Sequence, residues 1–216
     1  MDGLQRYISQ RQDTLLTDFV QHALVVALAL AIATVIGVGI GLLTWQRPFA
    51  RSVAIASAGT MLTIPSFALL GLLIPLLGLG WTPTVVALVL YSLLPIVRNT
   101  IVGLKEVDPA LVEAGRGVGM SSARVLRTIQ LPLAWPVILT GIRVSAQLVI
   151  GIAAIAAYVA GPGLGNPIFD GLARLGAKNA IDAAIVGTVG VVILALLFDL
   201  FFVVVRRVTT SRGLRV

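Results

Sequence analysis

Apolar stretches long enough to cross a lipid bilayer constrain this chain more than any other feature of its sequence. They cover about residues 20–43, 53–77, 84–102, 136–160 and 183–205. A bilayer core of about 30 Å needs about 20 apolar residues in a helix, which satisfies its own backbone hydrogen bonds. Only 12% of the residues are charged, about half the share of an ordinary soluble domain. The pattern predicts an all-α integral membrane protein with five transmembrane helices in a single domain, residues 1–216.

Prolines and glycines inside these stretches predict local features of the helices. The second stretch contains Pro65, Gly71 and Pro75, so we expect a kinked or broken helix there. The first stretch contains GVGIG, Gly37–Gly41. This run lacks the third glycine of a dinucleotide-binding motif and lies within a lipid-spanning segment. Its GxxxG spacing instead predicts a face where another helix packs closely.

The basic residues segregate between the two ends of the expected spans, which predicts how the chain is oriented. Lysine and arginine are enriched on the cytoplasmic side of membrane proteins. We therefore expect a multi-pass membrane protein with the N-terminus external and the C-terminus cytoplasmic. The net charge of +7 then reflects orientation among membrane lipids and predicts no nucleic-acid partner. The expected cytoplasmic face holds Arg47, Arg51, Arg98, Lys105, Arg116, Arg124, Arg127, Arg143, Arg206, Arg207, Arg212 and Arg215, and the opposite face holds Arg6, Arg11, Arg174 and Lys178.

Several kinds of chemistry are excluded or disfavoured by residue content. The chain has no cysteine and one histidine, His22, so it predicts no disulfide, no thiolate catalysis and no metal site. His22 is interpreted as a polar residue at the outer membrane boundary. No GxxxxGK[ST] motif occurs, so ATP hydrolysis would belong to a partner chain, and we expect neither catalysis nor a cofactor on this one. Asp199, near the inner end of the last span, is expected to have a structural role beside basic residues such as Arg206.

A polar segment, residues 108–132, separates the third and fourth spans. Asp108 followed by Pro109 is a strong helix start, because aspartate caps free amides and proline suits the first helical position. Glycines then predict a turn, and Ser121 is expected to cap a second short helix that runs to about Ile129. Leu131 and Pro132 are expected to end this second helix. The segment therefore predicts a helix–turn–helix held between two membrane helices.

The spacing of residues within this segment resembles the EAA loop of ATP-binding-cassette importer permeases, the element that docks on an ATPase subunit. One position departs from the family pattern, because Gly115 stands where a second alanine is usual. An amphipathic loop lying on the lipid headgroups is the alternative, but it explains neither the glycines nor the spacing. The resemblance implies an ATPase-coupling role for Glu113, Ala114, Gly115, Gly119, Arg124, Ile129, Leu131 and Pro132.

Flanking sequences narrow the resemblance to permeases for glycine betaine, carnitine and choline. The similar strings are TIPSFALLGLLIPLLGLG, LYSLLPIVRNT and LPLAWPVILTGIRVSAQLVIGIAAIAAYVAGPGLG, within about residues 63–165. The resemblance implies a type I importer core, similar to methionine permeases, that imports a quaternary ammonium osmoprotectant by alternating access. It also implies a location in a prokaryotic inner membrane, two ATPase subunits, a second permease chain in a homo- or heterodimer, and an external substrate-binding protein. A methionine-type amino-acid importer and a membrane scaffold without a pathway are the alternatives.

Aromatic residues in the spans are weak candidates for the substrate pathway. Phe67, Tyr91 and Tyr158 offer ring faces that attract a quaternary ammonium. Aromatic side chains in membrane spans more often serve packing or lie at the interface. By resemblance, the high-affinity aromatic cage belongs to the binding protein, and the glycine-rich stretch Gly161–Asn179 forms the external mouth.

Overall fold

The computed structural model describes residues 2–210 of the chain, so Arg212 and Arg215 of the expected basic face lie outside it. The described part is helical apart from its turns and short connections. The elements are α1 (Asp2–Gln10), α2 (Gln12–Thr44), α3 (Pro48–Thr63), α4 (Ser66–Leu77), α5 (Trp81–Lys105), α6 (Pro109–Gly117), α7 (Ser122–Val125), the π turn η1 (Leu126–Gln130), α8 (Leu131–Ile155), the 3₁₀ turn η2 (Ala156–Val159), α9 (Gly165–Ala173) and α10 (Ala180–Thr209).

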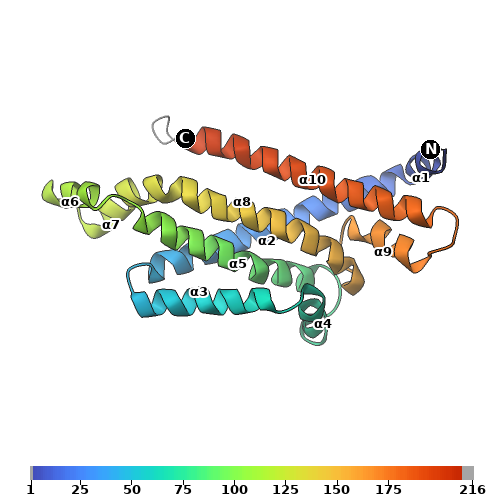
Figure 1. Cartoon of the computed structure of the whole chain (residues 1–216), viewed down its shortest axis with the longest axis horizontal. Helices are drawn as coiled ribbons and strands as arrows, with labels where there is room; N and C mark the ends of the chain where they lie inside the picture. The colour runs from blue at the N-terminus through green and yellow to red at the C-terminus, as the bar shows by residue number, and fades with distance from the viewer. Residues whose placement is uncertain (1, 211–216) are drawn as a thin grey trace.

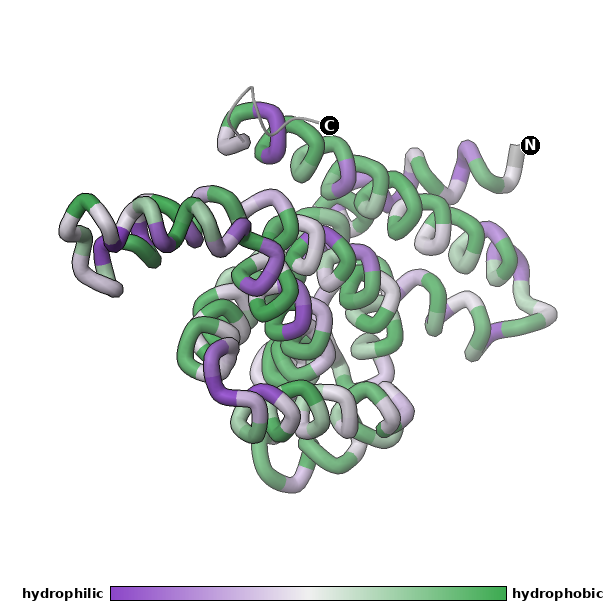
Figure 2. The backbone as a smooth tube through the Cα atoms, turned by 60° about the vertical axis from the view of Figure 1, so that its left-hand side comes forward, coloured by the Kyte–Doolittle hydropathy of each residue, from purple (hydrophilic) through white to green (hydrophobic). Residues whose placement is uncertain are grey.

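The long helices form an elongated bundle with two distinct ends (Figure 1). One end carries α6, α7 and the C-terminal end of α10, and the other carries α1, α9 and the connection from α9 to α10. Hydrophobic residues dominate the long helices, and hydrophilic ones gather toward helix ends and connections (Figure 2). Four helices within residues 2–210 are long and apolar enough to cross a membrane, or up to five if α3 and α4 count as one broken span.

The second expected span, 53–77, is divided into two helices at Pro65. The axes of α3 and α4 are bent by 96° relative to each other. Pro65 has no backbone N–H and pushes the preceding residue toward an extended conformation, which Ile64 adopts with φ −74° and ψ 126°. The hydroxyl of Tyr91 donates a 2.7 Å hydrogen bond to the Ile64 carbonyl freed by this break. The expected break is therefore real, and Pro75 remains within α4.

The helix that contains the first expected span extends beyond it. α2 begins at Gln12 and has 33 residues, so it includes polar residues that were expected to precede a span starting near residue 20. A helix does not have to end where the bilayer ends, because water satisfies exposed polar side chains beyond the lipid. Residues 2–10 form the separate helix α1, which contacts both α2 and α10.

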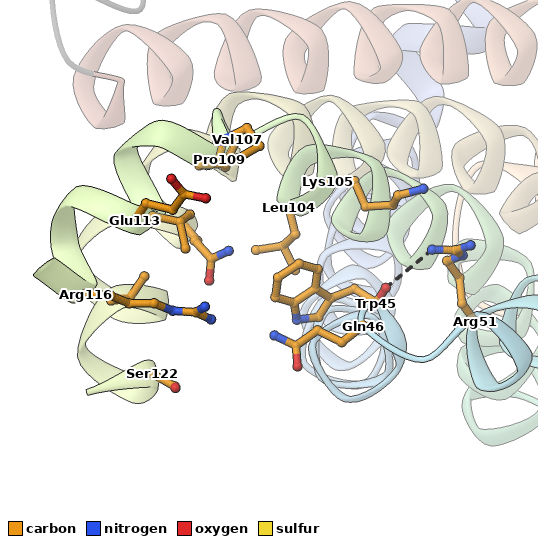
Figure 3. A pocket seen from close by; sticks show the side chains of 13 residues that line it. Trp45, Gln46, Arg51, Leu104, Lys105, Val107, Pro109, Glu113, Arg116 and Ser122 are labelled. Atoms are coloured by element: carbon orange, nitrogen blue, oxygen red, sulfur yellow. Dashed lines mark hydrogen bonds between the residues drawn. The ribbon is translucent and has the colours of Figure 1, made fainter. Parts of the chain in front are cut away.

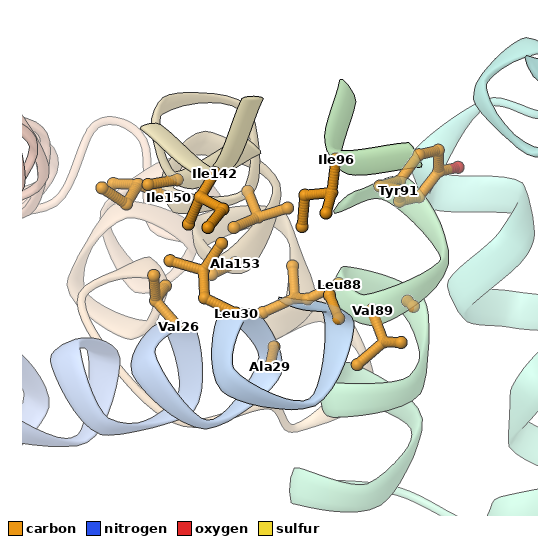
Figure 4. Packing of buried hydrophobic residues seen from close by; sticks show 14 of the residues in the cluster. Val26, Ala29, Leu30, Leu88, Val89, Tyr91, Ile96, Ile142, Ile150 and Ala153 are labelled. Carbon is orange, nitrogen blue, oxygen red and sulfur yellow. The ribbon is translucent and has the colours of Figure 1, made fainter. Parts of the chain in front are cut away.

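The hydrophobic core lies between α2, α5 and α8 (Figure 4). Leu30 of α2, Leu88 and Ile96 of α5, and Ile150 of α8 interdigitate there and are almost completely buried. Half of the apolar window of α5 is buried inside the protein, but only 11% of that of α10. α5 is therefore the central helix, and most of α10 is left for lipid or for a partner chain.

Two glycines of α2 set its distance from α5. A Cβ added at Gly37 would lie 2.7 Å from Ile96 Cγ2, and one added at Gly41 would lie 2.5 Å from Thr100 Cγ2. Carbon atoms in contact normally stay about 3.5–4.0 Å apart, so neither position has room for a side chain. The predicted close-packing face of the GVGIG run is confirmed.

His22 is completely buried and holds a glycine-rich segment against α2, which the interpretation as a boundary residue did not anticipate. The Leu164 backbone N–H donates to Nδ1 of His22 over 3.2 Å, so the proton of the neutral ring lies on Nε2. Nε2–H in turn donates to the Ile150 carbonyl over 3.1 Å. One turn earlier on α2, Asp18 accepts a 3.2 Å hydrogen bond from Asn166. These contacts join α2, α8 and the start of α9.

Gly41→Ala should destabilise the bundle, because the new Cβ would lie 2.5 Å from Thr100 Cγ2 and force α2 and α5 apart. Overpacking of this kind typically costs about 1–3 kcal/mol, so we expect a lower midpoint of thermal unfolding in detergent. Gly39→Ala is the matched control, because its Cβ would meet no atom within 4 Å. Alanine favours helices over glycine, so this control should keep or raise the midpoint. Equal midpoints would contradict the packing interpretation.

Candidate functional site

The first helix of the segment 108–132, called the coupling loop below, starts as its sequence predicts. The Asp108 carboxylate accepts a 2.8 Å hydrogen bond from the Ala110 N–H, and Pro109 occupies the first helical position. The predicted second cap is also present, because Ser121 Oγ accepts from the Arg124 N–H over 3.4 Å. Local capping therefore determines where both helices of the loop begin.

The turn between α6 and α7 has the hydrogen-bond pattern of a Schellman motif. The Gly119 N–H donates to the Arg116 carbonyl over 2.9 Å, and the Met120 N–H donates to the Gly115 carbonyl over 3.1 Å. Gly119 has φ +82°, the left-handed region that residues with a Cβ rarely adopt. Of the three glycines that predicted a turn, Gly119 is the one whose backbone requires glycine.

The prediction that Leu131 and Pro132 end the second helix is wrong. A single helical run of 38 residues extends from Ser122 to Val159. It continues through the π turn η1, in which the Leu131 N–H donates to the Leu126 carbonyl five residues earlier. This wider turn lies immediately before Pro132, which has no N–H to donate and would otherwise crowd the preceding turn. The second half of the coupling loop is therefore a direct extension of α8.

The eight predicted coupling residues divide into an exposed set and a packed set. Gly115 is buried, and a Cβ added there would lie 2.7 Å from Ile129 Cδ1, so these two residues join α6 to the π turn. Ile129 and Leu131 are partly buried. The exposed members are Glu113, Ala114, Gly119, Arg124 and Pro132.

An apolar cavity and a polar cavity flank α6. The apolar cavity, of about 620 Å³, lies between α6 and the start of α8 and is lined by residues such as Leu111, Ala114 and Trp135. Trp135 also donates a 2.8 Å hydrogen bond to Thr209 at the end of α10.

The polar cavity, of about 520 Å³, separates the coupling loop from the turn between α2 and α3. Glu113 and Arg116 lie on the loop side, and Trp45 and Gln46 lie opposite (Figure 3). Trp45 and Glu113 are far apart in sequence, so the motif alone gave no signal for this second wall. The loop therefore presents an apolar recess on one side and a charged one on the other.

The structure brings two of the three pathway candidates together. Phe67 of α4 and Tyr158 of η2 have ring centroids 4.1 Å apart, and their side chains are 47% and 57% exposed. α4, which carries Phe67, lies toward the half of the bundle that holds α9 (Figure 1). Tyr91 is 2% exposed and does not join them, because its hydroxyl bonds the α3–α4 break. A pathway role for Phe67 and Tyr158 remains a prediction.

Asp199 lies beside a basic residue, as expected, and this residue is Arg143 of α8. The Arg143 guanidinium donates to both carboxylate oxygens of Asp199 over 2.7 Å. Gln147, one turn further along α8, donates to Asp199 Oδ1 over 2.9 Å. Arg143 therefore lies midway along α8 and not at the inner end, where the charge pattern had placed it. The two charges are 56 residues apart, so their pairing was not visible in the sequence.

Comparison with known proteins identifies the family. Residues 33–210 match the family described as "Binding-protein-dependent transport system inner membrane component". The chain belongs to this family.

Two curated relatives align over almost their whole length. The chain is 35% identical over 215 residues to the glycine betaine/carnitine/choline transport system permease protein OpuCB of Bacillus subtilis, covering 100% of this chain and 97% of that protein. It is 40% identical over 200 residues to the osmoprotectant import permease protein OsmW of Salmonella typhimurium, covering 90% of this chain and 91% of that protein.

Solved structures share the fold. A crystal structure of the MetNI methionine ABC transporter in an inward-facing conformation matches with a TM-score of 0.81 at 22% identity, covering 94% of this chain and 99% of that one. An amino acid ABC transporter with histidines matches with a TM-score of 0.75 at 19% identity, covering 93% and 96%. The predicted all-α core of a type I importer permease is confirmed.

Membership in this family assigns the chain a transport role without catalysis. It is a multi-pass, membrane-spanning permease of a prokaryotic ATP-binding-cassette importer, located in the inner membrane. ATP hydrolysis belongs to a separate partner chain, and a substrate-binding protein is a second partner. The recognition of an importer permease from the spacing of the coupling loop is therefore confirmed.

Proposed function

We propose that this chain is the permease subunit of an importer for a quaternary ammonium osmoprotectant such as glycine betaine, carnitine or choline. The proposal rests on curated permeases named for these compounds, to which the chain is 35% to 40% identical over nearly their full length. The methionine transporter supports the shared fold alone, because its identity is only 22%. A scaffold without a pathway is less consistent with a coupling loop that continues directly into a central helix.

The proposed assembly contains two permease chains, identical or similar, with two ATPase subunits on the cytoplasmic side and the binding protein outside. Its orientation places the coupling loop and the end of α10 in the cytoplasm, and the N-terminus and α9 outside. The segregation of basic residues supports this orientation. The structure is compatible with it, because these two sets of elements lie at opposite ends of the bundle (Figure 1).

Coupling is proposed to run through the coupling loop into α8. The exposed Glu113, Ala114 and Arg124 would contact the ATPase, while the contact of Gly115 with Ile129 keeps the two halves of the loop together. A movement of the loop would be transmitted directly to the membrane-spanning part of α8, because Ser122–Val159 is one helical run. Closure of the ATPase pair would then tilt α8 against α5, as alternating access requires.

The orientation is testable with single cysteines, because the natural chain has none. Leu175, 68% exposed, and Val118, 76% exposed, lie at the two opposite ends. A membrane-impermeant thiol reagent added to cells with a permeable outer layer should label Leu175→Cys. Val118→Cys should react only after the inner membrane is opened. The reverse pattern would refute the proposed orientation.

Gly119→Val should uncouple the permease from its ATPase. Forcing a side chain into φ +82° costs about 1–2 kcal/mol, and valine is bulkier still at its Cβ. We expect normal membrane insertion, loss of most ATPase co-purification and a fall in uptake of at least about tenfold, equivalent to about 1.4 kcal/mol. Gly117→Val is the matched control, because Gly117 is helical and a Cβ there meets no atom within 4 Å. Full uptake by Gly119→Val would rule out the proposed docking turn.

The substrate assignment is tested with the purified complex in lipid vesicles. Without its binding protein, the complex should hydrolyse ATP slowly and without response to osmolytes. The binding protein loaded with glycine betaine should raise hydrolysis and drive uptake of labelled glycine betaine. Stimulation by a methionine-loaded binding protein alone would favour the amino-acid importer. Purification of the permease without any ATPase would favour the scaffold.

A further inference from the structure

Arg143, Gln147 and Asp199, called the polar triad below, form a charged cluster on the surface of the bundle within its membrane-spanning part. The shortest contact of the ion pair is 2.6 Å, and the side chains of Arg143 and Asp199 are 34% and 32% exposed. Gln147 is more exposed than either charge. The cluster is therefore well bonded internally but not covered by the rest of the chain.

The polar triad lies deep within its two helices. Asp199 precedes the end of α10 at Thr209 by ten residues, or about 15 Å, and Arg143 follows the start of α8 at Leu131 by twelve residues, or about 18 Å. The other Asp, Glu, Lys and Arg residues of the four long helical runs within residues 2–210 lie within about two turns of a helix end. Within residues 2–210, the charges of the triad are therefore the ones that lie farthest from the ends of the long helical runs.

A partly exposed ion pair at this depth is unfavourable against hydrocarbon, so such residues normally face a bundle interior or a water-filled cavity. The surface around the triad supports the second environment. Thr140, Gln147 and Gly151 form an exposed stripe of polar and small residues on α8, with the exposed Val144 and Leu148 along one side of it. The face of α10 that points away from Asp199 is instead apolar and exposed, as at Ile193, Leu197 and Val204. Lipid suits the α10 face, and water suits the α8 face.

We propose that the polar triad lines the aqueous substrate pathway and sets its preference between osmolytes of different net charge. This inference rests on the proposed osmoprotectant function. Choline carries a net positive charge, whereas glycine betaine and carnitine carry a carboxylate that balances their ammonium. A paired Arg143 and Asp199 present no net charge, so the wall admits both kinds of substrate. Removing one partner leaves the other charge uncompensated next to the passing molecule.

Two single substitutions with opposite electrostatic effects test the selectivity. Arg143→Gln leaves Asp199 unpaired and should raise the ratio of choline to glycine betaine uptake about fivefold, because a lone carboxylate attracts a cation and repels a substrate carboxylate. Asp199→Asn leaves Arg143 unpaired and should lower the ratio by a similar factor. The exchange Arg143→Asp with Asp199→Arg should return the ratio to that of the natural chain. Thr188→Val on α10 is the control, because its hydroxyl bonds only within its own helix, to Ala184.

A second measurement does not depend on the substrate. In vesicles, a positively charged methanethiosulfonate needs water to reach a thiol, and the natural chain has no cysteine. Gln147→Cys should react at least about tenfold faster than Leu197→Cys, which is 49% exposed on the apolar face of α10. A ratio of choline to glycine betaine uptake that stays unchanged, or shifts the same way in both charge variants, overturns the selectivity role. Equal reaction rates of the two cysteines overturn the pathway position. Fast reaction of Gln147→Cys in a complex that imports neither osmolyte supports the pathway position and refutes the osmoprotectant assignment alone.

Discussion

The close approach of α2 and α8 to α5 is the contact on which the rest of the structure depends. In lipid, helices gain little from the hydrophobic effect against one another, so their association relies on tight van der Waals contact. Gly37 and Gly41 permit this contact on one side of α5, and Gly103 and Gly141 permit it on the other, where an added Cβ would lie within 3.0 Å of α8 or α5 atoms. The packing of α5 between α2 and α8 thus forms the core to which the elements at both ends of the bundle are attached.

Each end of that bundle is joined to the core by a different means. At the end that carries α6 and α7, the connection is a continuous helix, because the helical run from Ser122 enters α8 without a break. At the opposite end, the connection is made by hydrogen bonds, because His22 bonds the backbone at both Ile150 and Leu164. The two ends are therefore held to the core by different means, an unbroken helix at one and side-chain hydrogen bonds of a buried histidine at the other.

Local features of the fold were predictable from the sequence, because their causes are local. Apolar length predicted the spans, Asp108 and Ser121 predicted the helix starts, and Gly119 predicted the turn. The spacing of Glu113, Gly119 and Pro132 predicted the family. Pro132 was misjudged because a π turn before it relieves the constraint that usually ends a helix.

Features that depend on long-range contacts were not predictable in the same way. The pairing of Arg143 with Asp199 joins residues 56 positions apart, and charge counting alone placed Arg143 at the wrong depth. His22 was assigned to a boundary because the sequence does not show that Ile150 and Leu164 supply its partners. The break at Pro65 was predictable, but its hydrogen-bond partner Tyr91 was not, because this residue comes from another helix.

The break at Pro65 also gives the protein an uneven hydrophobic thickness. α3 has 16 residues and is about 24 Å long, whereas the apolar stretch of α10, residues 183–205, is about 34 Å long. A hydrocarbon layer of about 30 Å exceeds the first and is exceeded by the second. Acyl chains beside α3 must therefore shorten or bend around α4, whose Leu72 and Leu76 are exposed. Lipids of a given chain length will therefore match the two flanks of this permease unequally. A change in membrane thickness should affect the flank of α3 and the flank of α10 differently.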